Sequence, residues 1–230
     1  MKLMLKTKNS TLKNNIKTIY NNIDKAKKTK QEVKLLAVSK THPLKTITQA
    51  ISLGVSCFGE NKIQEAEKKF KNKPENIELH FIGHLQKNKI KKALEIFDVI
   101  QTVDSLDLAE KINKHAINKQ KQQRIYCQIN IGNDPKKFGF KESEAIEHIK
   151  QIGKLTHLNL EGLMTILPFN LNETATKSLY QKMHKLYKTI QSTHTTCKEL
   201  SMGMSNDYMV AIECGSTVIR VGTGLFGKRL

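Results

Sequence analysis

The fold of this chain is decided by residues 33–58, VKLLAVSKTHPLKTITQAISLGVSCF. The run Val33–Val38 is short and mostly apolar, which is typical of a strand buried on both faces of a parallel sheet. Pro43 favours the first turn of a helix, and the apolar residues after it recur at helical spacing until Gly54. A second short apolar run follows at Val55–Phe58. The segment therefore predicts one strand–helix–strand unit.

The same alternation continues to the end of the chain. Further strands are predicted at residues 78–82, 99–103, 124–131, 160–167, 200–204 and 218–221. Helices are predicted at residues 61–71, from 87, from 105, from about 142, at 173–192 and at 208–213. Strands that alternate with helices indicate a parallel α/β sheet. Eight such strands in 230 residues without a linker predict a single (β/α)8 barrel of the TIM type, with an open, doubly wound sheet as the alternative.

An additional helix is predicted before the first strand. Residues 10–30 are polar and lysine-rich, and their apolar residues recur at helical spacing, at Leu12, Ile16, Ile19, Tyr20 and Ile23. We expect residues 1–230 to form one domain, in which the helix within residues 1–30 packs on the barrel.

The composition predicts a cytoplasmic protein. No run of about 18 apolar residues is present, and the apolar stretch at the start is too short for a signal peptide. The four cysteines are scattered without a CxxC pair, which fits neither a zinc site nor a redox motif. We expect them to be buried, free thiols in a reducing compartment.

The formal charge of +18 raises the possibility of a nucleic-acid partner. However, 36 of the 39 basic residues are lysine, and they are spread through nearly every segment. A nucleic-acid surface would favour arginine and interleaved aromatic residues, and aromatic residues make up only 6% of the chain. Solvated surface lysines are the preferred interpretation.

Polar and glycine residues follow the predicted strands at their carboxyl ends, which meet at one rim of a parallel barrel. Lys40 ends the first strand, where partial burial would lower the pKa of its amine and favour a Schiff base. At the other end of the chain, Gly222-Thr223-Gly224 follows strand eight and Ser205 follows strand seven. Loops at these positions often bind phosphate. Because strands one and eight are neighbours in a closed barrel, the two features fit one phosphorylated aldehyde.

Other polar residues have weaker signals. His80 and His84 lie in a strand and the loop after it, where a four-residue spacing does not align metal ligands, so no metal site is predicted. Glu60 could titrate near a ligand, but capping of the following helix is slightly favoured. Met202 and Met204 are expected to fill the barrel interior rather than to contact a cofactor.

Six segments resemble the pyridoxal phosphate homeostasis protein family, which is similar to the N-terminal barrel domain of alanine racemase. They are LAVSKT at 36–41, FGEN at 58–61, HFIGHLQKNK at 80–89, GLM at 162–164, LSMGMS at 200–205 and VIRVGT at 218–223. The segments occur in the family's order, and the resemblance covers residues 32–228 approximately. His84 departs from the pattern, since proline is as common there, but it lies outside the expected cofactor contacts.

The resemblance implies pyridoxal 5′-phosphate (PLP) as the cofactor. It implies Lys40 as the Schiff-base lysine, and Ser205, Gly222 and Thr223 as the phosphate-binding residues. It also implies Asn61 near the ring and Arg220 facing the pyridine nitrogen. A permanent cation there disfavours protonation of that nitrogen and weakens the cofactor as an electron sink. A structural ion pair is the alternative role for Arg220.

The resemblance favours a carrier over an enzyme, with no catalytic residue. A racemase needs acid and base groups on both faces of its substrate, and in alanine racemase the second group comes from another domain and subunit. We expect a monomer that holds PLP, delivers it to apo-enzymes and so affects amino-acid pools indirectly. A small PLP-dependent amino-acid racemase or decarboxylase is the first alternative, and a basic nucleic-acid-binding protein is the second.

Overall fold

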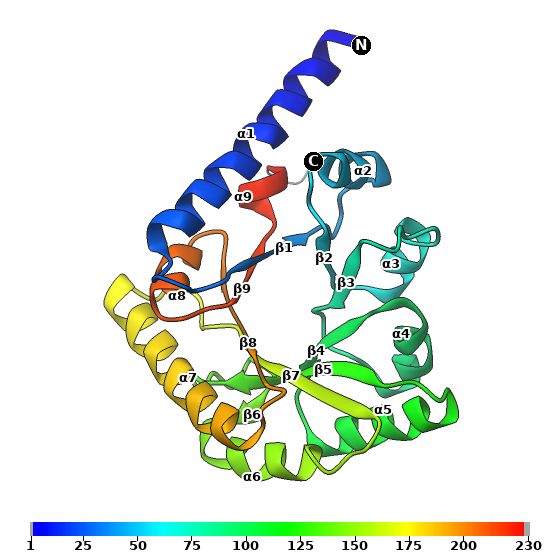
Figure 1. The fold of residues 1–230 in the computed structure, drawn as a ribbon, viewed down its shortest axis with the longest axis vertical. Coiled ribbons are helices and arrows are strands. Elements are labelled where there is room, and N and C mark those ends of the chain that lie inside the picture. Colours follow the sequence, from blue (N-terminus) through cyan, green and yellow to red (C-terminus); the bar gives the residue numbers. More distant parts are fainter. Residues whose placement is uncertain (1, 228–230) are drawn as a thin grey trace.

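The computed structural model describes residues 2–227, with side chains from Ser10 onward. Eight parallel strands form a closed barrel, in which β1 pairs with β2 and β9 and the pairing of β4 with β5 completes the ring (Figure 1). This confirms the predicted fold. The barrel strands are β1 (Lys34–Val38), β2 (Cys57–Glu60), β3 (Glu78–Phe81), β4 (Val99–Val103), β5 (Gln123–Asn130), β7 (Leu158–Thr165), β8 (Glu199–Met204) and β9 (Val218–Val221).

Helices surround the barrel and connect its strands (Figure 1). Two short elements escaped the sequence analysis, the two-residue strand β6 beside β5 and the single helical turn α9 after β9, because neither has a measurable periodicity. The elements outside the barrel are α1 (Lys2–Ala26), α2 (Leu44–Ser52), α3 (Ile63–Lys69), η1 (Lys87–Lys89), α4 (Ile90–Ile96), α5 (Leu106–Asn118), β6 (Phe140–Lys141), α6 (Glu142–Ile152), α7 (Glu173–Thr193), α8 (Tyr208–Glu213) and α9 (Thr223–Phe226).

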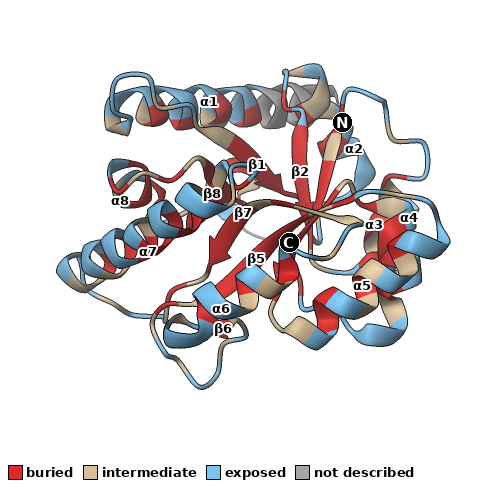
Figure 2. Cartoon of the chain, turned by 60° about the horizontal axis from the view of Figure 1, so that its bottom comes forward, coloured by how far each residue is buried: buried red, intermediate tan, exposed pale blue. Residues whose placement is uncertain are grey.

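The strands are buried on both faces, as the continuous apolar runs predicted. All five residues of β4 are buried, and so are the last four of β1. The helices instead bury one face and expose the other (Figure 2). In α5, for example, Leu108, Ala109, Ile112 and Ala116 are buried, at the three- and four-residue spacing of one helix face. The four cysteines are buried and free.

Helix α1 packs on the barrel through Leu12, Ile16, Ile19 and Ile23, which are all buried, against α8 and α9. It begins earlier than residue 10 and ends at Ala26, four residues before the predicted end. The segment after α1 is held to α8 and the loop that follows α8. Gln31 Nε2 donates there to the carbonyl oxygens of Ile212 and Ser216.

The second strand lies two residues further along the chain than predicted, at Cys57–Glu60 instead of 55–58. The apolar run ends at Phe58, but Gly59 and Glu60 are also fully buried strand residues. Glu60 can occupy a buried strand position because it has polar partners there, described below. Within residues 2–227, the structure has no helix with the length and apolarity needed to cross a lipid bilayer.

Candidate functional site

A cavity of about 180 Å³ lies at the carboxyl-terminal end of the barrel. Its walls come from the ends of β1, β2, β3, β7, β8 and β9, as expected where the strands of a parallel barrel meet at one rim. All six residues expected at the cofactor site line this one cavity. The complete lining is Val38, Lys40, His42, Asn61, Ile82, Ile166, Met204, Ser205, Arg220, Gly222 and Thr223.

Lys40 lies two residues beyond β1 and is half-buried, while Leu36–Ser39 before it are buried. Its backbone is therefore the point at which the chain leaves the barrel interior. The Lys40 side chain lines the cavity. It lies near residues of β9, which are far away in the sequence, because β1 and β9 are hydrogen-bonded neighbours.

A cluster of Glu60, Glu65 and Lys69 fixes the backbone before Lys40. Lys69 Nζ lies 3.0 Å from Glu60 Oε1 and 2.5 Å from Glu65 Oε1, and it donates to the carbonyl oxygen of Ser39 at 2.8 Å. The Ser39 hydroxyl donates to Glu60 Oε1 at 2.6 Å. Hence both the main chain and the side chain of Ser39 are held by this Glu60–Glu65–Lys69 cluster.

The same cluster also holds the backbone after Lys40. The Thr41 amide N–H donates to Glu65 Oε1. Thr41 has a φ of +66°, a left-handed conformation that is costly for a β-branched residue and needs support from its surroundings. Anchors on both sides of Lys40 restrict where its side chain begins. Sequence reasoning missed this cluster, because its members look like surface charges and Lys69 is 30 residues from Ser39, which it contacts.

Glu60 does not cap the helix after it, so that expectation is wrong. The residue at the N-cap of α3 is Lys62, and the Glu60 side chain is instead fully buried against Ser39 and Lys69. Burial raises the pKa of Glu60, against the opposing effects of the Ser39 hydrogen bond and the Lys69 charge. Glu60 therefore belongs to the support of Lys40.

Arg220 is a buried cation whose partners are neutral. Its Nη1 donates to the carbonyl oxygen and the Oγ of Ser201 at 2.8 and 2.7 Å, and its Nη2 donates to the carbonyl oxygen of Thr165 at 2.6 Å. Among the residues with described side chains, no carboxylate forms an ion pair with it. The structural ion pair considered as an alternative role is therefore absent there. Burial lowers the pKa of Arg220, but a guanidinium remains charged in proteins.

The part of the cavity wall that follows β8 and β9 carries hydroxyl and glycine residues. Gly222 and Thr223 begin the α9 turn, and Ser205 follows β8. The Gly224 amide N–H donates to Ser205 Oγ at 3.2 Å, which ties the two loops together. Backbone N–H groups and hydroxyls that converge in this way can accommodate an anionic oxygen.

Asn61 brings an acceptor without a partner into the cavity. Its Oδ1 is buried and makes no hydrogen bond within the described part of the protein. Gly83 lets its backbone approach that of Asn61 closely, because a Cβ atom at Gly83 would lie only 2.2 Å from the Asn61 carbonyl oxygen. An unsatisfied buried acceptor costs free energy, so a ligand that donates a hydrogen bond here would be favoured.

The structure corrects the expectation for Met204 and adds His42 to the site. Met202 is fully buried, as expected, but Met204 is at the end of β8 and lines the cavity instead of filling the barrel interior. His42 also lines the cavity, and its ring lies 4.8 Å from that of Phe226. The only sequence signal for His42 is its position two residues after Lys40.

The two histidines of the third strand and its loop have separate surroundings. His80 is fully buried inside the barrel, while His84 lies at the rim with its side chain 43% exposed. His84 Nδ1 is 3.2 Å from Asp104 Oδ2, and its ring stacks on Phe138 with centroids 3.8 Å apart. The structure therefore does not bring the two imidazoles together.

Comparisons with known proteins agree with this architecture. Residues 15–229 match the family model described as the N-terminal domain of alanine racemase. The chain is 40% identical over 229 residues to the pyridoxal phosphate homeostasis protein of Pasteurella multocida, covering 95% of this chain and 98% of that protein.

Two solved structures illustrate the range of similarity. PipY of Synechococcus elongatus, solved with PLP bound, is 32% identical with a TM-score of 0.82, and the match covers 94% of this chain and all of PipY. An alanine racemase of Clostridium difficile is 17% identical with a TM-score of 0.77, covering 94% of this chain but 55% of that one, and shares the fold. The chain belongs to the family of the alanine racemase N-terminal domain and, within it, to the pyridoxal phosphate homeostasis proteins.

Proposed function

We propose that this protein binds PLP in the cavity at the carboxyl-terminal end of the barrel and takes part in PLP homeostasis. The observation that carries the proposal is the convergence of Lys40, Asn61, Ser205, Arg220, Gly222 and Thr223 on this one cavity. The PLP-bound structure of PipY and the names of the other relatives support it.

The chemistry of the cavity fits PLP at three points. Asn61 Oδ1 is a buried acceptor that the PLP ring hydroxyl could satisfy. Ser205, Gly222 and Thr223 offer hydroxyl and backbone donors for the phosphate. Arg220 can face the pyridine nitrogen only as a donor, because a guanidinium has no acceptor, and so it would keep that nitrogen unprotonated. These residues would bind and orient the cofactor without activating it fully as an electron sink.

Lys40 is proposed to hold PLP covalently. PLP supplies an aldehyde, and the neutral Lys40 amine would attack its carbon to form a Schiff base, with the aldehyde oxygen leaving as water. The Glu60–Glu65–Lys69 cluster would keep the start of the Lys40 side chain in place for this reaction. The linkage also protects a reactive aldehyde from other amines.

The lining favours a holder of PLP over a racemase or decarboxylase. Within the described part of the cavity wall, the titratable side chains are Lys40, His42 and Arg220. Lys40 and His42 both follow β1, whereas a racemase needs proton donors and acceptors on both faces of its substrate. Steady-state assays across the amino acids, read by chirality and product, test this; turnover above about 1 per second would favour an enzyme.

The cellular role is part of the same proposal. We infer that the protein acts in the cytoplasm as a monomer, passes PLP to apo-enzymes and thereby influences amino-acid pools. Transfer is measured by mixing the PLP-loaded protein with a PLP-dependent apo-enzyme and following the recovery of that enzyme's activity. Light scattering over a range of concentrations measures the oligomeric state, and a stable dimer would contradict the monomer.

The first experiment is the absorbance spectrum of the purified protein with PLP, before and after borohydride. Wild type is expected to show a visible band that borohydride removes, with a mass increase on the Lys40 peptide. Lys40→Ala should lose the trapped mass. Lys45→Ala is the matched control, because Lys45 is an exposed lysine of α2 near the same loop, and it should behave as wild type.

Two outcomes would overturn the proposal. A folded wild-type protein that takes up no PLP would exclude the cofactor, and trapping at another lysine would exclude Lys40 as the attachment point. If the protein were instead a nucleic-acid-binding protein, its affinity for nucleic acid would fall steeply with salt concentration and would be unaffected by Lys40→Ala.

A further inference from the structure

A chain of buried polar side chains runs from the cavity into the barrel interior. Arg220 Nη1 donates to Ser201 Oγ at 2.7 Å, Ser201 Oγ donates to Gln101 Oε1 at 2.8 Å, and Gln101 Nε2 lies 2.7 Å from His80 Nδ1. These residues belong to β9, β8, β4 and β3, and Ser201, Gln101 and His80 have no exposed surface. Barrel interiors are usually filled by branched apolar side chains, so this Arg220–His80 chain requires an explanation.

The hydrogen bonds of the Arg220–His80 chain have one consistent direction. A guanidinium can only donate, so Ser201 Oγ accepts from Arg220 and gives its own hydrogen to Gln101 Oε1. The amide nitrogen of Gln101 then faces His80 Nδ1, which must be an acceptor. It follows that neutral His80 carries its proton on Nε2, which lies 3.3 Å from Glu78 Oε2.

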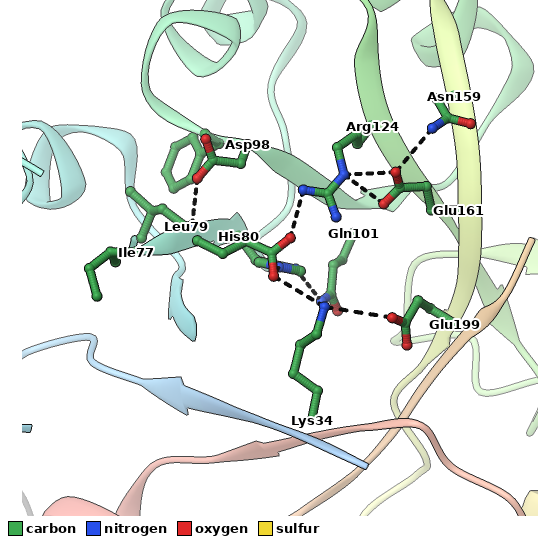
Figure 3. A network of polar contacts seen from close by, with 12 residues as sticks. Lys34, Ile77, Leu79, His80, Asp98, Gln101, Arg124, Asn159, Glu161 and Glu199 are labelled. Carbon is green, nitrogen blue, oxygen red and sulfur yellow. Dashed lines mark hydrogen bonds and ion pairs between the residues drawn. The ribbon is translucent and has the colours of Figure 1, made fainter. Parts of the chain in front are cut away.

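The far end of the chain is anchored by ion pairs near the opposite end of the barrel (Figure 3). Glu78 Oε1 lies 2.6 Å from Arg124 Nη1, and Glu78 Oε2 lies 3.1 Å from Lys34 Nζ. Burial lowers the pKa of His80, so the ring is neutral, as the chain requires. Burial would raise the pKa of Glu78, but the neighbouring His80 and the charges of Lys34 and Arg124 keep it well below its usual value.

The same region has a set of groups that could be mistaken for a metal site. One ligand atom each of Cys57, Glu78 and His80 lies within 4.8 Å of the others. However, both oxygens of Glu78 already contact cations, Lys34 and Arg124, and their charges oppose the entry of a metal ion. The cluster is better explained as the anchor of the Arg220–His80 chain.

Arg220 needs this chain because no carboxylate among the described side chains pairs with it. The other acceptors of its Nη atoms are the carbonyl oxygens of Ser201 and Thr165, which the barrel backbone fixes. The Ser201 hydroxyl can rotate about its Cβ–Oγ bond, so an acceptor for its hydrogen helps to keep a lone pair facing Arg220. Gln101 engages that hydrogen. Loss of the Gln101 amide would therefore loosen a guanidinium that it does not touch.

We infer that Gln101 and Ser201 are positioning residues that hold Arg220 in the orientation it needs at the PLP ring nitrogen. The inference rests on the proposed PLP site. It assigns to two fully buried polar residues a role beyond packing, and it makes the tuning of the cofactor depend on the Arg220–His80 chain through the barrel.

The test compares Gln101→Met, which keeps the size of the side chain without its hydrogen bonds, with Gln123→Met. Gln123 is a matched control, because it is another fully buried glutamine of the barrel whose amide bonds only to the carbonyl oxygens of Asp98 and Arg124. For Gln101→Met we expect a shifted absorbance band of bound PLP and about tenfold weaker PLP binding, equal to about 1.4 kcal/mol. Gln123→Met should lose stability but keep the wild-type band and affinity.

A second pair of variants addresses Ser201. Ser201→Ala should reproduce the shifted band. Ser201→Thr, which keeps the hydroxyl, should show the wild-type band. If Gln101→Met and Ser201→Ala fold and keep the wild-type band and affinity, the positioning role is wrong while the PLP site stands. A wild-type protein that takes up no PLP would instead refute the proposed function.

A measurement without PLP tests the Arg220–His80 chain even if Gln101→Met and Ser201→Ala fail to fold. Nitrogen-15 NMR of histidine-labelled wild-type protein reports which ring nitrogen of His80 carries the proton, with His80→Gln identifying the signals. A proton on Nε2 with Nδ1 accepting a hydrogen bond is expected. A proton on Nδ1 would reverse the Gln101 contact and overturn the inference.

Discussion

At the scale of single residues, the site depends on how two cations are held. The residues on either side of Lys40, Ser39 and Thr41, are hydrogen-bonded to the Glu60–Glu65–Lys69 cluster. Arg220 is surrounded by neutral oxygens. Lys40 was expected at the site because it ends an apolar run, and Arg220 was expected there because of the family resemblance. Their supports could not be predicted, because Lys69 and Gln101 resemble many other polar residues until the strands are assembled.

Lys69→Met is expected to test the support of Lys40. It removes one cation from two carboxylates and a carbonyl group, and breaking such a partly buried pair costs about 3 kcal/mol of unfolding free energy. We also expect slower formation of the borohydride-trappable linkage at Lys40, measured by stopped-flow absorbance after addition of PLP.

Lys68→Met is the control, since Lys68 is the exposed neighbour in α3 and should keep both the stability and the rate of wild type. Lys69→Arg retains the charge and should recover part of the rate. A Lys69→Met protein that forms the linkage at the wild-type rate would show that the cluster serves stability alone.

At the scale of elements, several helix starts were predicted to within one residue. The helix predicted from residue 105 is α5, and Ser105 is its N-cap, with an Oγ that accepts from the Leu108 N–H at 3.3 Å. Helix α8 lies at the predicted residues 208–213. By contrast, β2 was displaced by two residues, because hydrophobicity alone cannot show that Glu60 has buried partners.

Ser105→Ala should lower the free energy of unfolding by about 1 kcal/mol, because the first turn of α5 loses its capping acceptor. Equilibrium unfolding in urea measures this change. Ser178→Ala, at an exposed position inside α7, is the comparison and should change stability little or increase it slightly, since alanine favours a helix interior. An equal loss in both variants would exclude a capping effect at Ser105.

At the scale of the whole molecule, closure of the barrel joins residues that are far apart in the sequence. The pairing of β1 with β9 brings Leu36 beside Arg220, and the pairing of β4 with β5 completes the ring. Helix α1 contributes Leu12, Ile16 and Ile19 to the large hydrophobic core that the strands and the other helices share. We propose that the chain is one domain with α1 as a part of it; residues 1 and 228–230 lie outside the described structure.

Two expectations follow for unfolding. Far-UV circular dichroism and tyrosine fluorescence should report one shared thermal transition, and separate transitions would argue against a single domain.

PLP at about 100 times its dissociation constant should stabilise the wild type by about 2.7 kcal/mol and raise the melting temperature. At the same PLP concentration, the Lys40→Ala protein should be stabilised by a smaller free energy than the wild type. An analogue without the aldehyde should stabilise both proteins equally, which separates the covalent contribution from the rest of the site.

The sequence by itself determined the alternating strands and helices and the polar residues at the strand ends, because hydrophobic periodicity and strand-end polarity are local properties. Only the tertiary structure decided what supports those residues. Ser201 and Gln101 are 100 positions apart, and Lys69 is 30 positions from Ser39, yet each pair is hydrogen-bonded. Such contacts depend on which strands are neighbours and which faces point inward. The burial that makes these hydrogen bonds strong exists only after the barrel has closed.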